Sequence, residues 1–229
     1  MIATVHDNRG ALPGSRLELY EEICEVLLVR RQEDKGIADQ IQLNAAQKQS
    51  VLQVLALELM IRKTREFTLA FTKHIDEQMT AVAGNRITPQ EFLKHVEQIS
   101  GLLVERDLGV YEFAHLSFQE YLTAVQIKES NQEQILIDNI NDSWWHETIR
   151  LYAVRSDTTN LIRAALESPT ISSLTLASDC LEEGLSADPV VRQQLEEKLA
   201  SGLESTELET AELAAQVKLS RRLKHASAN

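Results

Sequence analysis

The pattern of apolar and polar positions changes its period in the middle of the chain, within residues 110–123. The first part of this stretch alternates, which predicts a strand with one half-buried face. Its two faces are expected to hold Tyr111, Phe113 and His115 on one side, and Glu112 and Ala114 on the other. The alternation stops there, and a helical pattern follows.

We expect that helix to begin at Ser117. Ser117 and Glu120 have the spacing of a capping box, in which a hydroxyl and a carboxylate accept hydrogen bonds from backbone amides at the helix start. Apolar residues then recur at helical spacing and make one face: Phe118, Tyr121, Leu122 and Val125. The pattern therefore predicts His115 at a strand–helix junction, where its imidazole leaves a packed element and can reach a ligand.

Helical spacing also dominates the residues before this junction. Ser15 and Asn44 are expected to cap helices over 15–31 and 45–65, and the second is apolar on nearly all sides, so it should form the centre of a core. Thr88-Pro89, with Glu91 three residues beyond Thr88, predicts the start of another helix. The other expected elements are a loop over 32–43, a weak strand within 66–72, and helices over 73–83 and 88–99.

Two short strands are expected at Leu102–Glu105 and Val110–Phe113, joined by a hairpin turn at residues 106–109. Helices followed by a two-stranded hairpin are typical of a winged-helix domain, in which the hairpin is the wing. The strand that ends at His115 is then the second strand of that wing.

Beyond Ile127 the pattern is helical throughout, and paired short helices with tight turns are typical of an α-solenoid, although no clear repeat appears in the letters. The expected helices are 132–140, 143–154, 158–166, 172–183, 189–202 and 207–223. The predicted fold class is mainly α: a winged-helix domain with a small β-hairpin wing, followed by a solenoid-like helical domain. The predicted domains are a link over residues 1–15, the winged helix over 16–128 and the helical domain over 129–229.

Composition and charge reduce the classes of partner and the cellular compartments that are expected for this protein. A net charge of -12 repels phosphate backbones, so the sequence argues against a nucleic-acid partner. No apolar run approaches the roughly 20 residues that span a bilayer, so no membrane partner is expected. Cys24 and Cys180 are isolated on apolar helix patterns, which favours a reducing cytoplasm over a disulfide scaffold or zinc site.

The chain carries little catalytic chemistry. It has no Gly-Lys dipeptide and no Gly-x-Gly, so a phosphate-binding loop is absent and we expect no nucleotide hydrolysis, no catalytic residues and no cofactor in this chain by itself. His74, His95 and His225 are scattered and lack the spacing of metal ligands. Trp144 and Trp145, with His146 and Glu147, are interpreted as packing at a domain junction.

Three stretches resemble NACHT-type STAND NTPases, the class that includes bacterial antiphage sensors and animal NOD-like receptors. Phe113–Leu122 is similar to the signature that closes the winged helix of that family. Residues 1–20, through MIATVH, Gly10, Leu12-Pro13, Arg16 and Leu19-Tyr20, resemble the link into the winged helix, and Trp145–Ile149 resembles the start of the helical domain that follows. The resemblance implies that the nucleotide-binding core precedes Met1, which agrees with an apolar segment at 1–6 that has nothing nearby to pack against.

The resemblance also implies a role for His115. In that family the winged-helix histidine contacts the β-phosphate of ADP and holds the closed, inactive form, and such a charge-assisted bond is worth roughly 1.5–3 kcal/mol. The implied function is a regulatory arm that relays nucleotide or ligand state in signalling or antiphage defence. The implied cofactors are ADP or ATP with Mg in the intact parent protein, and the implied partners are its nucleotide-binding domain, further copies on activation, and a sensor ligand that the sequence does not identify.

Two other interpretations remain open from the sequence. The first is a DNA-binding winged helix with a helical oligomerisation domain, whose recognition helix would be 88–99. That helix carries Glu91, Lys94 and Glu97 and sums to a negative charge, whereas a helix for the major groove should be positive. The second is a plain helical scaffold, which would place His115 in an apolar core with an internal partner.

Overall fold

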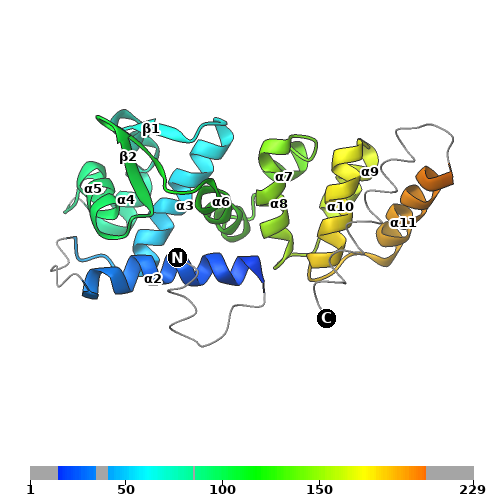
Figure 1. Ribbon diagram of the computed structural model, residues 1–229, viewed down its shortest axis with the longest axis horizontal. Coiled ribbons are helices and arrows are strands. Elements are labelled where there is room, and N and C mark those ends of the chain that lie inside the picture. Colours follow the sequence, from blue (N-terminus) through cyan, green and yellow to red (C-terminus); the bar gives the residue numbers. More distant parts are fainter. Residues whose placement is uncertain (1–14, 35–40, 85, 205–229) are drawn as a thin grey trace. The chain divides into compact units, whose positions relative to one another are not determined.

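The computed structural model describes residues 15–34, 41–84 and 86–204 of the 229-residue chain, without the side chains of 30–34 and 202–204. The chain divides into two compact units, Met1–Asn131 and Gln132–Asn229 (Figure 1). The expected link over 1–15 lies outside the described residues, apart from Ser15. Each unit is considered separately below.

Three helices of the first unit begin at the predicted caps. Helix α2 (Arg16–Asp34) starts after Ser15, whose hydroxyl oxygen accepts a hydrogen bond from the Glu18 amide at 3.2 Å. Helix α3 (Ala45–Ile61) is capped by Asn44 and α5 (Pro89–Ile99) by Thr88, each through a complete capping box. These bonds connect residues three apart, so the local sequence alone is sufficient to set the helix starts.

The core of the first unit is built on α3, as its all-round apolar pattern predicts. Val51, Leu52, Leu55 and Leu59 are all completely buried. Helix α6 (Leu116–Glu129) packs along α3, and α2 contacts both of them. Together these helices support the strand–helix junction.

The wing is present, and it belongs to a three-stranded sheet. Strands β2 (Leu103–Asp107) and β3 (Val110–Phe113) form the predicted antiparallel hairpin, with Gly109 at φ +72° in its turn. Strand β1 (Glu66–Thr68) adds to the free edge of β3, which gives the order β1-β3-β2. The weak alternation within 66–72 therefore marks a real strand, although a shorter one.

Several helix boundaries in this unit differ from prediction, and α2 for example extends to Asp34 instead of residue 31. Helix α3 ends at Ile61 instead of residue 65, because Lys63 adopts φ +52° and turns the chain into β1. The helix expected over 73–83 is a 3-10 helix η1 (Leu69–His74) followed by α4 (Asp76–Ala83). Apolar spacing does not distinguish a 3-10 turn from the first turn of an α-helix, which explains the error.

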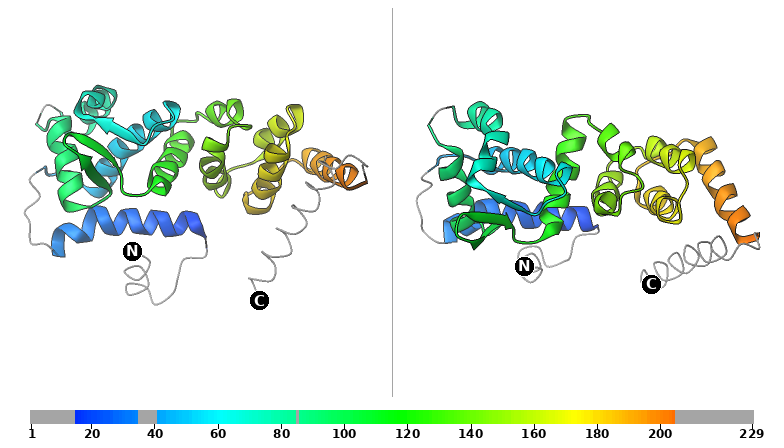
Figure 2. Two further views of the ribbon diagram at one scale, coloured as in Figure 1. Left: turned by 45° about the horizontal axis from the view of Figure 1, so that its top comes forward. Right: turned by 90° about the horizontal axis from the view of Figure 1, so that it is seen from above.

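The second unit is helical throughout its described part. Its elements are α7 (Gln134–Asp138), the 3-10 helix η2 (Ser143–Trp145), α8 (His146–Ala153), α9 (Thr159–Glu167), α10 (Ile171–Glu183) and α11 (Pro189–Glu204). Helix α10 packs on α8 and α9, and α11 packs on α9 and α10, so each of these two helices contacts the two helices before it (Figure 2). The helix expected over 207–223 lies outside the described residues.

The contacts of this unit follow a repeat that is not visible in the amino-acid sequence. Hydrogen bonds join Asn141 to Ser168, Thr158 to Ser186, and Arg150 to Asp179, over separations of 27, 28 and 29 residues. Nearly equal separations at successive loops and helices indicate stacked helix pairs of similar size, as in an α-solenoid. Each helix of the described part of the chain is too short or too polar to span a bilayer.

Candidate functional site

His115 lies between β3 and α6, as the change of period predicts. It is the N-cap residue of α6, with extended backbone angles of φ −138° and ψ 140°. The Ala114 amide donates to the Leu102 carbonyl at 2.9 Å, and the Phe118 amide donates to the His115 carbonyl at 3.1 Å. The backbone is thus held on both sides of His115, while its side chain is exposed.

An aromatic cluster supports the first turn of α6. Phe118 is 2% exposed, and its ring lies 5.9 Å from the His115 ring and 6.3 Å from the Tyr20 ring, which it meets edge-on. Tyr121, also buried, has its ring 6.0 Å from Tyr20. These contacts fix the start of α6 against α2, so the position of the imidazole depends on the packing of two helices.

A further contact anchors α6 to the other side of the domain. Gln119 is fully buried and its amide nitrogen donates to the Thr64 carbonyl at 3.1 Å. Thr64 lies in the connection between α3 and β1. Sequence reasoning missed Gln119 and Tyr20 as supporting residues, although Tyr20 belongs to an apolar stripe that the helical pattern contains.

The predicted capping box at Ser117 and Glu120 does not form. Helix α6 begins at Leu116, so Ser117 already lies within the helix and His115 takes the cap position without a side-chain cap hydrogen bond. Glu120 is buried instead of standing at the surface. The spacing was correct for a cap, but the end of β3 leads into the helix earlier than that spacing implies.

The predicted alternation along β3 is also wrong at two positions. Tyr111 and Phe113 are buried as expected, but Glu112 between them is buried too, and His115 is exposed. Glu112 can be buried because it is paired: its carboxylate lies 2.6 Å from Nε of Arg106 and 3.7 Å from Arg65. These two ion pairs join β3 to β2 and to the residue just before β1.

The chemistry available at the junction suits an anion. Helix α6 has 14 residues, so the amide groups of its first turn carry the partial positive charge of a helix N-terminus. An exposed imidazole at the cap adds a hydrogen-bond donor beside that end. The residues present therefore fit a phosphate group.

The other candidate residues are buried or contact neighbouring side chains of the same unit. Trp145 is 1% exposed, and burial lowers the pKa of the adjacent His146, with the positive charge of Arg150 as a second cause. His74 contacts Glu58 and Arg62 at 3.5 and 3.2 Å. Among the described residues, no group of His, Cys, Asp and Glu is arranged to hold a metal ion, and His225 lies outside them.

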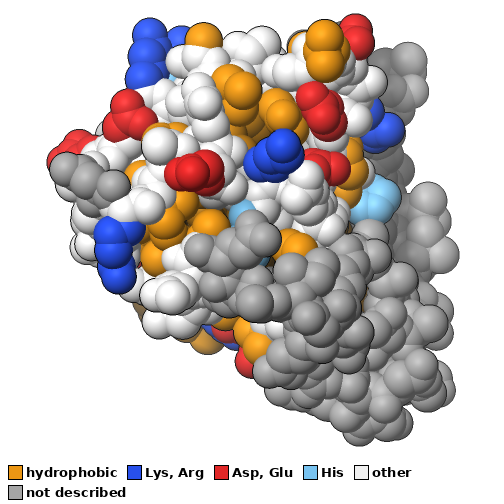
Figure 3. Space-filling view, turned by 90° about the vertical axis from the view of Figure 1, so that its left-hand side faces the viewer, with side chains coloured by type: hydrophobic (Ala, Val, Ile, Leu, Met, Phe, Trp, Pro, Cys, Tyr) orange, Lys and Arg blue, Asp and Glu red, His pale blue; other side chains and the backbone are white. Residues whose placement is uncertain are grey.

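Helix α5 does not present a basic surface. Its exposed positions include Glu91 and Lys94, so its charge stays mixed after folding. The face of the molecule that includes α5 carries single Lys and Arg side chains between acidic and hydrophobic ones (Figure 3). The folded structure gives no support to the DNA-binding interpretation.

Helices followed by a hairpin wing and a last helix define a winged-helix domain, and paired helices follow it in this chain. Residues 16–127 match the family of the winged helix-turn-helix domain C-terminal to NACHT, and this part of the chain belongs to that family. The resemblance read from Phe113–Leu122 is thereby confirmed: this is a NACHT-associated C-terminal domain that lacks the nucleotide-binding core. No curated protein matches the chain.

Proposed function

We propose that this chain is the regulatory arm of a NACHT STAND NTPase, and that His115 holds the ADP-bound, inactive state. The observation that carries the proposal is the position of His115: an exposed imidazole at the N-terminus of α6, on a backbone held by Leu102, just before β2, and by α6 itself. The winged-helix family supplies the partner, a NACHT nucleotide-binding domain of the same parent chain.

The proposed mechanism is a contact made in only one of two states. In the closed state His115 donates a hydrogen bond to the β-phosphate of ADP on the nucleotide-binding domain, and the amides of the α6 first turn favour the same negative charge. In the open state this contact is lost. A ligand can shift an equilibrium only by its differential affinity for the two states, and this bond supplies such a difference, roughly 1.5–3 kcal/mol.

The structure of the domain supports transmission of that change. His115 is joined through Phe118 and Tyr20 to α2, and α6 is joined through Gln119 to the loop after α3. A displacement of the junction therefore carries these helices with it. In this proposal the nucleotide-binding domain supplies Mg and hydrolysis, the protein acts in the cytoplasm in signalling or antiphage defence, and an open form assembles with further copies of itself.

The test requires the chain joined to the NACHT nucleotide-binding domain of its parent protein. ADP that co-purifies with the protein is measured for the natural sequence, His115→Leu and His115→Asn. Leucine removes the donor, and losing a bond of this strength weakens ADP binding by about 10- to 100-fold. Asparagine keeps an N–H donor and should retain part of the affinity.

His74→Leu is the matched control, because His74 is a half-buried histidine of the same unit that contacts Glu58 and Arg62 instead of facing solvent at a helix start. It should leave ADP retention unchanged. If His115→Leu retains ADP and remains autoinhibited to the same extent as the natural sequence, the proposal is wrong.

A further inference from the structure

Helix α6 carries two completely buried polar side chains one turn apart, Gln119 and Thr123. Residues four apart share one face of a helix, so both belong to the face from which Gln119 reaches the connection between α3 and β1. Gln119 itself lies one turn after His115. The pair is therefore close to the strand–helix junction but is separated from solvent.

The hydrogen bonds of this pair are incomplete. The amide nitrogen of Gln119 donates to the Thr64 carbonyl at 3.1 Å, and we call this the closed arrangement. The Oε1 atom of Gln119 and the Oγ1 atom of Thr123 are both buried, and neither has a hydrogen-bond partner in the described part of the chain. Buried polar atoms are nearly always hydrogen-bonded, and one without a partner lowers stability. The closed arrangement thus leaves two oxygen atoms unsatisfied.

An alternative arrangement of the same side chains is available. A hydroxyl can donate and an amide oxygen can accept, so the Thr123 hydroxyl can donate to Oε1 of Gln119 across one helical turn. That bond requires the Gln119 amide to turn away from Thr64. Thr64 cannot follow it, because its amide donates to the Leu59 carbonyl at 3.1 Å and its hydroxyl donates to the Glu66 carbonyl at 3.0 Å.

We propose that Gln119 is a hydrogen-bond switch between Thr64 and Thr123, and that it couples the position of α6 to the His115 site. In the closed arrangement Gln119 joins the first turns of α6 to the end of α3 and holds the junction in place. In the alternative arrangement α6 is released from the α3–β1 connection. The inference rests on the function proposed above, since it assigns the closed arrangement to the inactive, ADP-bound state. Two arrangements of similar free energy suit a switch, because a ligand shifts such an equilibrium through a modest difference in affinity.

Thr123→Val tests the switch, because valine has nearly the shape of threonine without the hydroxyl. It removes an unsatisfied oxygen from the closed arrangement and the hydrogen-bond donor from the alternative one, so both effects favour the closed state. In the chain joined to the NACHT nucleotide-binding domain, ADP should dissociate about 2- to 10-fold more slowly, the equivalent of one ordinary hydrogen bond. The urea midpoint of unfolding should equal or exceed that of the natural sequence.

Thr148→Val is the matched control. Thr148 is completely buried in α8 of the second unit, and its Oγ1 atom also has no hydrogen-bond partner among the described residues. Its replacement should likewise not lower the urea midpoint, but it should leave the rate of ADP dissociation unchanged.

Gln119→Met acts on the other side of the equilibrium. Methionine is similar to glutamine in length and cannot donate to the Thr64 carbonyl, so the closed arrangement loses its hydrogen bond. ADP should then dissociate faster than from the natural sequence. The two substitutions in α6 are thus expected to change the rate in opposite directions, which a general loss of stability does not do.

The proposal is overturned if Thr123→Val lowers the urea midpoint, because its hydroxyl then has a hydrogen-bond partner in the closed state. It is also overturned if Thr123→Val and Thr148→Val release ADP at the same rate, or if Gln119→Met does not accelerate release. His115→Leu in the same assay separates the two proposals. If that variant releases ADP faster while Thr123→Val has no effect, the switch is wrong and the proposed function stands.

Discussion

The ring of His115 lies 5.9 Å from the ring of Phe118 at the start of α6, yet only Phe118 is buried. Phe118 holds the helix in place, and the helix in turn presents His115 to solvent. The two residues therefore separate the structural role of Phe118 from the binding role that is proposed for His115.

Truncating the two rings should have very different effects on stability. Phe118→Ala removes a buried ring that contacts Tyr20, so the free energy of unfolding should fall by about 3–5 kcal/mol. His115→Ala should change it by about 0.5 kcal/mol or less, since the side chain is exposed. Urea unfolding measures both, and a large loss for His115→Ala would instead assign that residue to the core.

Glu112 should be the most sensitive charge of the wing. Glu112→Gln leaves Arg106 and Arg65 without their common carboxylate and should lower the free energy of unfolding by about 1–3 kcal/mol. Glu66 faces Glu112 across the β1–β3 pair but is exposed, so Glu66→Gln should change stability by about 0.5 kcal/mol or less. Equal losses in the two variants, measured by urea unfolding, would contradict a special role for the buried pair.

Cys24 should make the chain less stable at alkaline pH. Burial raises the pKa of its thiol from 9.0 to about 12. The folded state keeps the proton after the unfolded chain has lost it, so the free energy of unfolding falls as pH rises from about 9 towards about 12, by at most about 1.4 kcal/mol per unit. Below the thiol pKa of the unfolded chain both states keep the proton, so none of this stability is lost there.

The pH dependence of Cys24 is isolated by difference, because tyrosines and lysines titrate in the same range. Urea unfolding of the natural chain and of Cys24→Ala is compared at successive pH values from about 8 to about 11. The stability advantage of the natural chain should shrink with rising pH. An advantage that stays constant would show that the thiol ionises equally in both states.

Gly184 is required where the loop before α11 runs alongside the loop before α9. A Cβ at this position would collide with the Thr158 side chain and lie 2.6 Å from the Cys180 carbonyl oxygen. Gly184→Ala should therefore cost about 1–3 kcal/mol in a thermal or urea melt. Thr158→Ser removes the colliding methyl group and keeps the hydroxyl that bonds to Ser186, so it should recover part of the loss. If the stability changes of Gly184→Ala and Thr158→Ser simply add in the double variant, the strain does not come from contact between these two residues.

Much of the fold follows from local patterns in the sequence. Ser15, Asn44 and Thr88 cap their helices as predicted, because each cap connects residues only three apart. The hairpin and the position of His115 were predicted for the same reason: a change from period two to helical spacing is a property of consecutive residues. The order of the elements, helices followed by a hairpin, and the resemblance of Phe113–Leu122 then indicated the winged-helix class.

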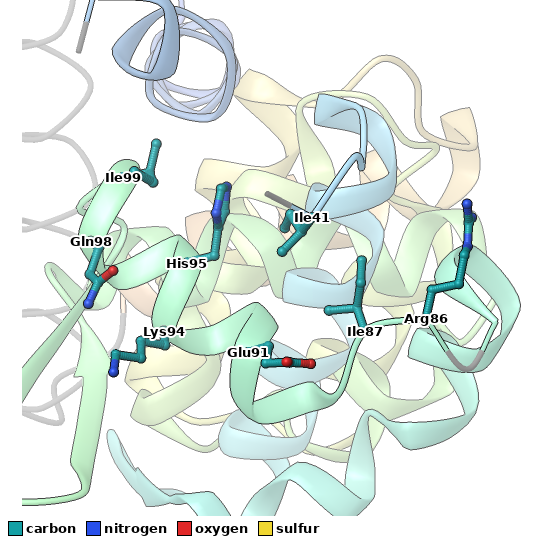
Figure 4. A pocket seen from close by; sticks show the side chains of 8 residues that line it. All are labelled: Ile41, Arg86, Ile87, Glu91, Lys94, His95, Gln98 and Ile99. Carbon is teal, nitrogen blue, oxygen red and sulfur yellow. The ribbon is translucent and has the colours of Figure 1, made fainter. Parts of the chain in front are cut away.

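The tertiary structure decided whatever depends on distant residues. It buried Glu112 by bringing Arg65 and Arg106 to it, added β1 to the wing, and moved the start of α6 ahead of Ser117. It also set the 27- to 29-residue repeat of the second unit and placed Ile41 beside residues 86–99, with which it lines a pocket (Figure 4). Local spacing records which backbone bonds a segment can make by itself, whereas burial, charge pairing and cavities arise only when separate segments pack.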